Sequence, residues 1–189
     1  PHTWETGDDR YLLEYTTMGF YDFALDADGA GWTILCEMAA APPEDVTDRY
    51  VGRFGIAATD SARAWRIRLN PAACWENGVA IDADTYLYSY RELLDGRMMN
   101  RRADSLYAGA FAIVGAKEYL YGQTGWENVG IVKEGEYTLT FVTTVPIADP
   151  DFYVPYNLTG TYLVYEPLWE ACKTGFDEKG NPVSPDSDR

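Results

Sequence analysis

Four residues near the start of the chain have the types and spacing of an EF-hand calcium loop. Positions one, three, six and twelve of such a loop supply carboxylate oxygens, a sharp glycine turn and a bidentate glutamate. The chain places Asp26, Asp28, Gly31 and Glu37 at these positions. Ala30 stands at position five, where it removes one expected oxygen ligand. We therefore expect no calcium site here and interpret the segment as a turn between two strands.

The histidine and cysteine residues disfavour the commonest kinds of enzyme and metal chemistry. His2 is the only histidine, so a serine or cysteine nucleophile has no imidazole base and zinc has no credible ligand set. Cys36, Cys74 and Cys172 lie far apart and form no CxxC motif. We expect buried free thiols, and one disulfide with a leftover thiol is the alternative. The sequence therefore predicts no catalytic residue, no metal ligand and no cofactor.

Aromatic residues are abundant, with 6 Trp and 15 Tyr in the chain. On an acidic secreted protein such rings can stack on sugars or line a peptide cleft. The alternative is that most of them fill a hydrophobic core, and periodicity favours burial for Trp65, Tyr86, Tyr90 and Phe141. Aromatic content alone does not choose between a binding surface and a core.

Composition bounds the class of protein and its partners. A chain of 189 residues with 47% hydrophobic residues suits one folded domain rather than a disordered segment. The net charge of −15 disfavours nucleic acid and anionic membranes as partners. No apolar run approaches the roughly 20 residues of a membrane-spanning helix. No signal peptide is present at Pro1, so we expect any export signal to lie outside this chain.

The clearest structural signals come in the order strand, turn, helix. Residues 64–69 alternate apolar and polar side chains, which is the pattern of a half-buried strand. Asn77-Gly78 favours a tight turn because both residues tolerate positive φ. Asp82 is expected to cap a helix over residues 82–94, since its carboxylate can accept a bond from a free N–H of the first turn.

The remaining segments alternate strand and helix patterns. We expect strands at 50–57 and 137–141, the latter paired with 130–133, and short helices at 105–114, 115–121, 150–158 and 163–172. Prolines predict a loop over 39–47. Turn residues and further prolines predict that 176–189 is a loose tail on a single domain spanning 1–189. The fold class expected is α+β, with a small, mostly antiparallel sheet and several short helices.

This order of motifs resembles extracellular solute-binding protein family 5, the receptors of oligopeptide and dipeptide ABC importers. There a strand of the type W-x-F-x-L-R leads to W-S-D-G-x-P-V-T-A-x-D-F-x-Y-S. Residues 65–90 read WRIRLNPAACWENGVAIDADTYLYSY. Further likeness lies at 113–122 and 129–146, and it spans roughly 15–165 with an apparent insertion at 40–62.

Three positions depart from the family pattern. Ala80, Asp82 and Thr85 replace the usual Pro, Thr and Asp, so the family's reciprocal capping box is lost.

The resemblance implies that this chain is the small lobe of a longer receptor of three lobes. That lobe scaffolds one side of a cleft that closes around a peptide by a hinge motion. Ser105-Leu106-Tyr107-Ala108 matches the family's s-x-Y-a stretch, which implies that Tyr107 is a ligand-binding residue at the cleft rim. A purely structural role for Tyr107 is the other interpretation. The implied partners are the remaining lobes, a peptide ligand and a transporter permease. The implied location is extracellular, either as a cell-surface lipoprotein or in a periplasm.

Two alternatives from other classes stay open. The first is an aromatic-rich carbohydrate-binding module of a secreted protein, which fits the composition but not the ordered motif. The second is a secreted hydrolase that uses carboxylates, which the missing histidine and the short chain disfavour. The sequence leaves the cargo of the whole receptor open among peptide, nickel, heme and sugar.

Overall fold

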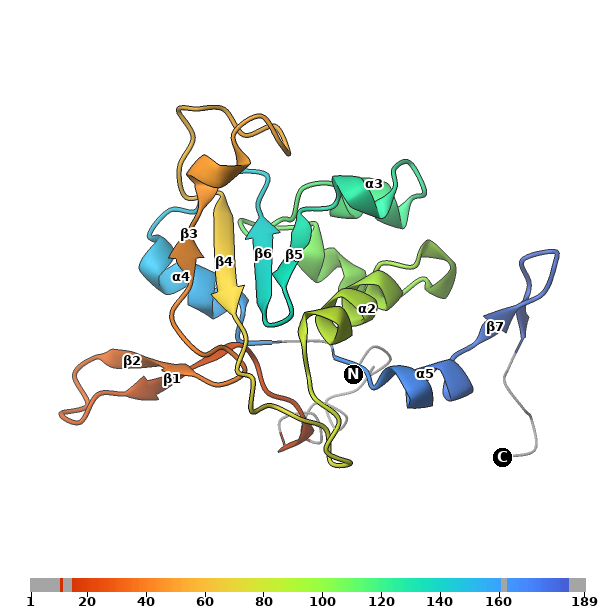
Figure 1. The fold of residues 1–189 in the computed structure, drawn as a ribbon, viewed down its shortest axis with the longest axis horizontal. Helices are drawn as coiled ribbons and strands as arrows, with labels where there is room; N and C mark the ends of the chain where they lie inside the picture. Colours follow the sequence, from red (N-terminus) through yellow and green to blue (C-terminus); the bar gives the residue numbers. More distant parts are fainter. Residues whose placement is uncertain (1–10, 12–14, 161–162, 184–189) are drawn as a thin grey trace.

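A four-stranded antiparallel sheet forms the centre of the computed structural model, which describes residues 11, 15–160 and 163–183 (Figure 1). Its strand order is β3 (Glu44–Asp45), β4 (Ala64–Arg68), β6 (Thr138–Val142) and β5 (Ile131–Gly135). Two separate hairpins pair β1 (Tyr21–Leu25) with β2 (Trp32–Cys36), and β7 (Gly175–Phe176) with β8 (Pro182–Val183). Every strand pairing is antiparallel, and the expected α+β class is confirmed.

The register of the sheet places alternate side chains on opposite faces. Trp65 pairs with Phe141 and Ile67 with Leu139, so these four side chains point to one face. Arg66 pairs with Thr140 on the opposite face. The strands predicted at 64–69, 130–133 and 137–141 are therefore confirmed.

Helix α2 (Ala83–Leu93) covers the apolar face of the sheet, and its start follows from a side-chain cap. The Asp82 carboxylate accepts a hydrogen bond of 2.9 Å from the Thr85 N–H, as the sequence predicts. The Thr85 hydroxyl donates to the same carboxylate at 3.1 Å. Tyr86, Tyr90 and Leu93 form part of the buried face of the helix.

The turn before α2 has the conformation that its glycine allows. Gly78 has φ of 81°, and its N–H donates to the Trp75 carbonyl at 2.8 Å. The Asn77 side chain accepts from the Val79 N–H at 3.1 Å, and an isolated bridge joins Cys74 to Ala80. The predicted tight turn is confirmed.

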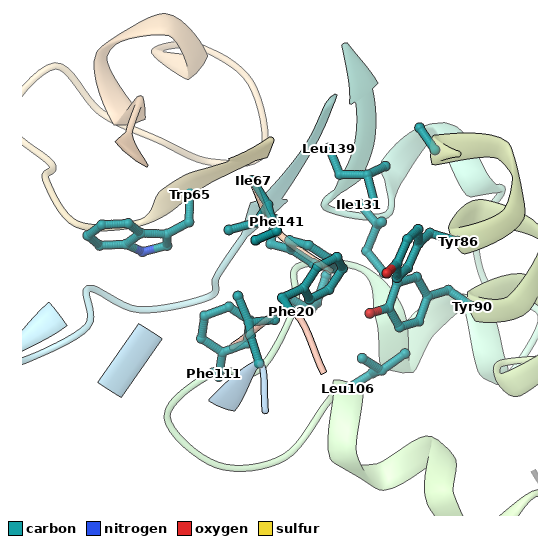
Figure 2. Close-up of a cluster of buried hydrophobic side chains, with 14 of the residues drawn as sticks. Phe20, Trp65, Ile67, Tyr86, Tyr90, Leu106, Phe111, Ile131, Leu139 and Phe141 are labelled. Carbon is teal, nitrogen blue, oxygen red and sulfur yellow. The ribbon is translucent and has the colours of Figure 1, made fainter. Parts of the chain in front are cut away.

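The main core lies between this sheet face and α2, and it is aromatic (Figure 2). Phe20 stacks on Tyr86 with ring centroids 4.7 Å apart and meets Phe141 edge-on at 5.9 Å. Tyr90 meets Phe141 edge-on at 5.8 Å. Trp65, Tyr86, Tyr90 and Phe141 are all buried, as expected from their periodicity. Stacked and edge-on ring pairs add about 0.5–1.5 kcal/mol each beyond area burial.

The opposite face of the sheet is covered by a second, smaller core. The strand predicted at 50–57, a segment that contributes to this core, was wrong. The expected strand at 50–57 is instead the 3-10 helix η1 (Thr47–Tyr50) followed by turns. Gly52, Phe54 and Gly55 have positive φ, which an extended strand cannot contain. Within the expected loop 39–47, β3 pairs with β4. The second core consists of Val46, Tyr50, Ile56, Ala64 and Val142.

The remaining helices are short. They are η2 (Gly96–Met98), η3 (Arg101–Leu106), α3 (Ala116–Leu120), η4 (Trp126–Asn128), α4 (Pro150–Asn157) and α5 (Glu166–Cys172). Helical segments predicted at 115–121, 150–158 and 163–172 are confirmed. The helix predicted at 105–114 was wrong, because η3 already ends at Leu106 and Gly109 has φ of 78°. The hairpin β7–β8 lies partly within the predicted loose tail, and the looseness of 176–189 stays a prediction.

The three cysteines are free but exposed, so the expectation of burial was wrong. Cys36 ends a strand of a two-stranded hairpin, and Cys172 ends α5, a helix without a buried residue. At these terminal positions both thiol side chains are open to solvent. Across the described ranges, the helices are all too short or too polar to traverse a bilayer.

Candidate functional site

Tyr107 lies at the end of η3, in a loop that is fastened to the sheet. Its backbone N–H donates to the Asp104 carbonyl at 3.1 Å, and its ring is half-buried against the main core. Leu106 before it is buried and accepts a hydrogen bond of 2.8 Å from the Ile113 N–H. Ile113 forms a bridge with Thr143 at the end of β6. The sheet therefore holds Tyr107 in place, with part of its ring exposed.

Small exposed residues follow Tyr107 and leave backbone groups accessible beside it. Ala108, Gly109 and Ala110 are exposed, and the left-handed backbone at Gly109 turns the chain. Within the described residues, no hydrogen bond involves the Tyr107 hydroxyl or the N–H of Gly109 or Ala110. A phenol and free backbone donors can bind a peptide through hydrogen bonds and ring contact. The ligand-binding role of Tyr107 stays a prediction, and the run of small residues at 108–110 is the signal in the sequence that marks its exposed neighbours.

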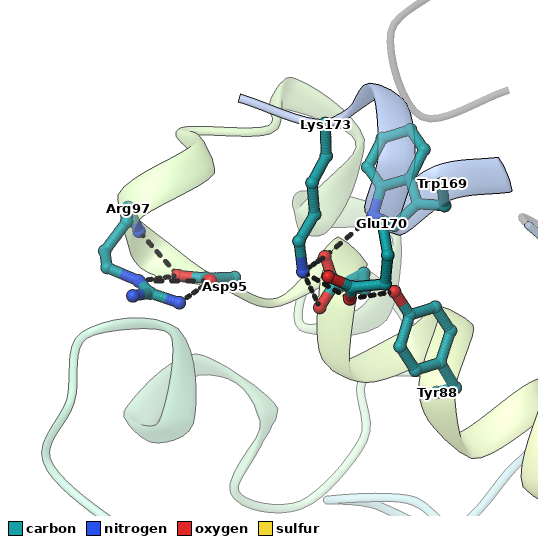
Figure 3. Close-up of polar contacts among 7 residues, drawn as sticks. Tyr88, Asp95, Arg97, Trp169, Glu170 and Lys173 are labelled. Atoms are coloured by element: carbon teal, nitrogen blue, oxygen red, sulfur yellow. Dashed lines mark hydrogen bonds and ion pairs between the residues drawn. The ribbon is translucent and has the colours of Figure 1, made fainter. Parts of the chain in front are cut away.

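A cluster of hydrogen bonds and ion pairs fastens α5 to α2 (Figure 3). Glu92 on α2 accepts from the Trp169 indole N–H at 2.7 Å and from the Lys173 amine at 3.1 Å. Glu170 on α5 accepts from the Tyr88 hydroxyl and, at 2.6 Å, from Lys173. Burial of Lys173 opposes its charge, but the hydrogen bonds and charges of the two glutamates outweigh burial and raise its pKa. A lysine with a raised pKa is a poor general base, so this cluster is structural.

A second cluster lies on the opposite face of the sheet and is also structural. The Glu134 carboxylate accepts hydrogen bonds from Tyr50 at 2.8 Å, Thr140 at 2.9 Å and Arg66 at 2.7 Å. Burial opposes ionisation, but these bonds outweigh it and leave the pKa of Glu134 below its ordinary value. A carboxyl with a lowered pKa is ionised near neutral pH, so it has no proton to donate as a general acid. The cluster instead joins β4, β5 and β6 to η1.

The acidic segment near the start of the chain forms the turn of the β1–β2 hairpin, as expected. Asp26 accepts from the Gly29 N–H at 2.8 Å through its backbone carbonyl, and its carboxylate accepts from the Thr33 hydroxyl. The Asp28 carboxylate accepts from the Ala30 N–H at 3.0 Å. Glu37 lies past the end of β2, where burial and then the charge of Asp22 raise its pKa. Among the described residues, no three His, Cys, Asp or Glu side chains are grouped as metal ligands.

His2 lies outside the described residues. Trp75 is half-buried against the main core beside the turn, with its ring 5.5 Å from that of Tyr165.

Similarity to known proteins comes from solved structures. No protein family model matches the chain, and no curated protein sequence matches it either. The solved structures that match include OppA of Listeria monocytogenes bound to peptide, with 21% identity, a TM-score of 0.64, and coverage of 89% of this chain and 28% of that chain. The pheromone receptor PrgZ, solved for its mode of peptide binding, has 20% identity and a TM-score of 0.67, with coverage of 97% of this chain and 32% of that chain.

The murein tripeptide-binding protein MppA of Escherichia coli gives the same result. It has 16% identity and a TM-score of 0.66, with coverage of 92% of this chain and 29% of that chain. The chain thus spans about a third or less of the length of each of these structures. The similar structures are consistently solute-binding proteins of the OppA and MppA type, so the resemblance predicted from the sequence is confirmed at the level of fold. The chain has the fold of one part of these larger binding proteins.

Proposed function

We propose that this chain is the small lobe of an extracellular peptide-binding receptor of an ABC importer, and that it scaffolds one side of the ligand cleft. The observation that carries the proposal is the match of nearly the whole chain to about a third of a peptide-binding receptor, at a TM-score of 0.67. The ordered motif at residues 65–90 supports it independently, because it was identified from residue types alone.

The chemistry of the described residues agrees with a binding role rather than a catalytic one. The carboxylates of both clusters accept hydrogen bonds and form ion pairs within the fold. The accessible groups beside Tyr107 are a phenol and backbone amides, which bind without reacting. Tyr107 is therefore proposed as a ligand contact that the rest of the lobe positions, with peptide bound between this lobe and another.

The partners and location of the receptor follow from the same proposal. The remaining lobes of the receptor supply the opposing wall of the cleft, and a transporter permease receives the peptide. The receptor acts outside the cytoplasmic membrane, either in a periplasm or as a lipoprotein on the cell surface. The negative net charge of the chain suits a surface that does not adhere to anionic lipid.

A test that separates this function from a carbohydrate-binding module is the identity of the molecules that the protein retains. The longer receptor, expressed from the reading frame that contains this chain, would be purified from rich medium, denatured, and its released ligands identified by mass spectrometry. We expect peptides in near-stoichiometric amount. Release of oligosaccharides in place of peptides would favour a carbohydrate-binding module. A reading frame that encodes no second lobe would contradict the proposal of a peptide receptor.

A further inference from the structure

The last described part of the chain, residues 165–183, lies on the surface of the lobe. It contains α5 and the β7–β8 hairpin, and none of its residues is buried. Leu168 on α5 is 63% exposed. Figure 1 shows α5 beside α2, with β7 leading away from the body of the lobe. We call residues 165–183 the strap.

The residue before the strap is anchored in the interior. Val164 is 5% exposed, and its N–H donates to the Ser89 hydroxyl of α2 at 3.0 Å. Ser89 is itself buried. From Tyr165 onward the contacts lie at the surface, beginning with the Tyr165 hydroxyl, which accepts from the Asn77 side-chain amide at 2.9 Å. The buried attachment of this part of the chain therefore ends at Val164.

Charged and polar side chains make the contact between α5 and α2 (Figure 3). The Lys173 amine lies between the carboxylates of Glu92 on α2, at 3.1 Å, and Glu170 on α5, at 2.6 Å. Glu92 lies in the last turn of α2, where the helix dipole disfavours a carboxylate, and its side chain is only 13% exposed. The Glu170 side chain is 47% exposed, so water can replace Lys173 there. The Lys173–Glu92 pair is therefore the contact that matters most for docking of α5.

The elements of the strap are too small to be stable without this contact. Helix α5 has 7 residues, and isolated helices shorter than about 12 residues are marginal in water. An isolated two-stranded hairpin is marginal as well. The Arg97 guanidinium lies 5.3 Å from the centre of the Phe176 ring on β7, but the Arg97 side chain is 68% exposed. Neither hydrophobic core contains a strap residue, so undocking of the strap removes no member of either core.

We infer that the strap is a conformational device that undocks as one unit beyond Val164, with Lys173 as its latch, while the sheet and α2 stay folded. The lobe then has two surface states. In the docked state α5 lies against Tyr88 and Glu92 on α2, and in the undocked state both side chains face water. Segments with few buried contacts are the ones that open locally at low free energy. The inference goes beyond the proposed function and does not rest on it, since every contact that it uses lies within this chain.

Hydrogen exchange of single amides, followed by NMR on the 189-residue chain, tests the inference. The Trp169 N–H forms a backbone hydrogen bond of 2.9 Å and reports on the strap, whereas the Val142 N–H forms one of 2.6 Å and reports on the sheet. In the unmodified chain Trp169 should exchange at least about tenfold faster than Val142, but more slowly than an unprotected amide. Lys173→Gln should accelerate exchange at Trp169 by about tenfold or more, because hydrogen bonds to charged groups contribute more than neutral ones. Exchange at Val142 should not change.

Lys179→Gln is the matched control, because Lys179 carries the same charge on the same strap and its amine has no hydrogen bond or ion pair among the described residues. It should leave exchange at Trp169 within about twofold of the unmodified chain. Glu92→Gln is a second variant that keeps an oxygen for the Trp169 indole. Combined with Lys173→Gln, it should accelerate exchange at Trp169 no more than about threefold beyond the faster single variant, because the two residues form one contact.

Three results would overturn the inference. Equal acceleration at Trp169 and Val142 in Lys173→Gln would show that the strap opens only when the whole lobe unfolds. Equal effects of Lys173→Gln and Lys179→Gln would assign the change to net charge rather than to a latch. Single-variant effects that multiply in the double variant would show that Lys173 and Glu92 act separately.

Discussion

Replacement of Glu134 by glutamine tests how the segment over the second sheet face is held. Glu134 Oε1 accepts from the Tyr50 and Thr140 hydroxyls. Oε2 accepts from Arg66 Nε at 2.7 Å and forms an ion pair with Arg66 Nη2 at 2.7 Å. Glutamine preserves the size of the side chain but leaves Arg66 facing a neutral amide. The Arg66 side chain is only 12% exposed, so water replaces the lost carboxylate poorly.

The size of the effect follows from these contacts. Hydrogen bonds to charged groups contribute about 1.5–3 kcal/mol, whereas partly exposed ion pairs with long contacts contribute about 0–1 kcal/mol. We expect Glu134→Gln to lower the free energy of unfolding by about 2 kcal/mol, which corresponds to about 4–8 °C in a domain of this size. Glu44→Gln is the matched control, because Glu44 contacts the same Arg66 at 3.4 Å and is 40% exposed. It should cost about 0.5 kcal/mol or less.

The pH dependence of the stability lost in Glu134→Gln distinguishes loss of the carboxylate charge from a change in packing. The pKa of Glu134 is lowered in the folded state. The ionised carboxylate therefore contributes to the free energy of unfolding at pH values above its unfolded-state pKa, near 4.3, and this contribution is lost as the pH falls through the folded-state pKa. Urea unfolding followed by tryptophan fluorescence should therefore show the deficit of Glu134→Gln at pH 7 and a shrinking deficit below about pH 4. Equal costs for the two variants at pH 7, or a deficit that does not change with pH, would refute the reasoning.

Three further outcomes are expected. Gly78→Val should destabilise the chain by about 1–3 kcal/mol, because valine is strained at φ of 81°. Gly78→Asn should cost less, because asparagine tolerates this region. Equal melting temperatures for the unmodified protein and both variants would contradict the predicted turn. Calorimetric titration with calcium should give no saturable heat at millimolar concentration, and an affinity tighter than about 100 µM would restore the calcium interpretation of the segment from Asp26 to Glu37. Tyr107→Ala in the longer receptor should weaken peptide binding by about tenfold or less, since one rim ring contributes on the order of 1 kcal/mol; no change in affinity would leave Tyr107 a structural residue.

Local signals made the centre of the fold predictable from the sequence. The Asp82 cap, the Asn77-Gly78 turn and the alternation in β4 each depend on residues within a few positions of one another. Burial of the aromatic core followed from the same periodicity. These features need no knowledge of the rest of the molecule.

The covering segments were not predictable in the same way. Residues 50–57 have an apolar pattern that predicted a strand, but their conformation is set by packing Tyr50 and Ile56 onto the sheet and by glycines with positive φ. The exposure of Cys36 and Cys172 likewise depends on how distant elements pack around the ends of β2 and α5. For the candidate site, the sequence predicted Tyr107 within a helix at 105–114, whereas η3 ends at Leu106. The proposed role of Tyr107 depends on an opposing wall that the described residues do not contain.

Peptide titration by calorimetry tests the central claim most directly, with the longer receptor and the 189-residue chain measured side by side against di- to pentapeptides. A cleft with one wall buries too little ligand surface to offset the entropy lost by a flexible peptide. The account predicts binding at micromolar affinity or better for some peptides to the receptor and no detectable binding to the short chain. Tight binding by the short chain alone would contradict the scaffold role and make this lobe the recognition element, and absence of binding to both would contradict the peptide receptor itself.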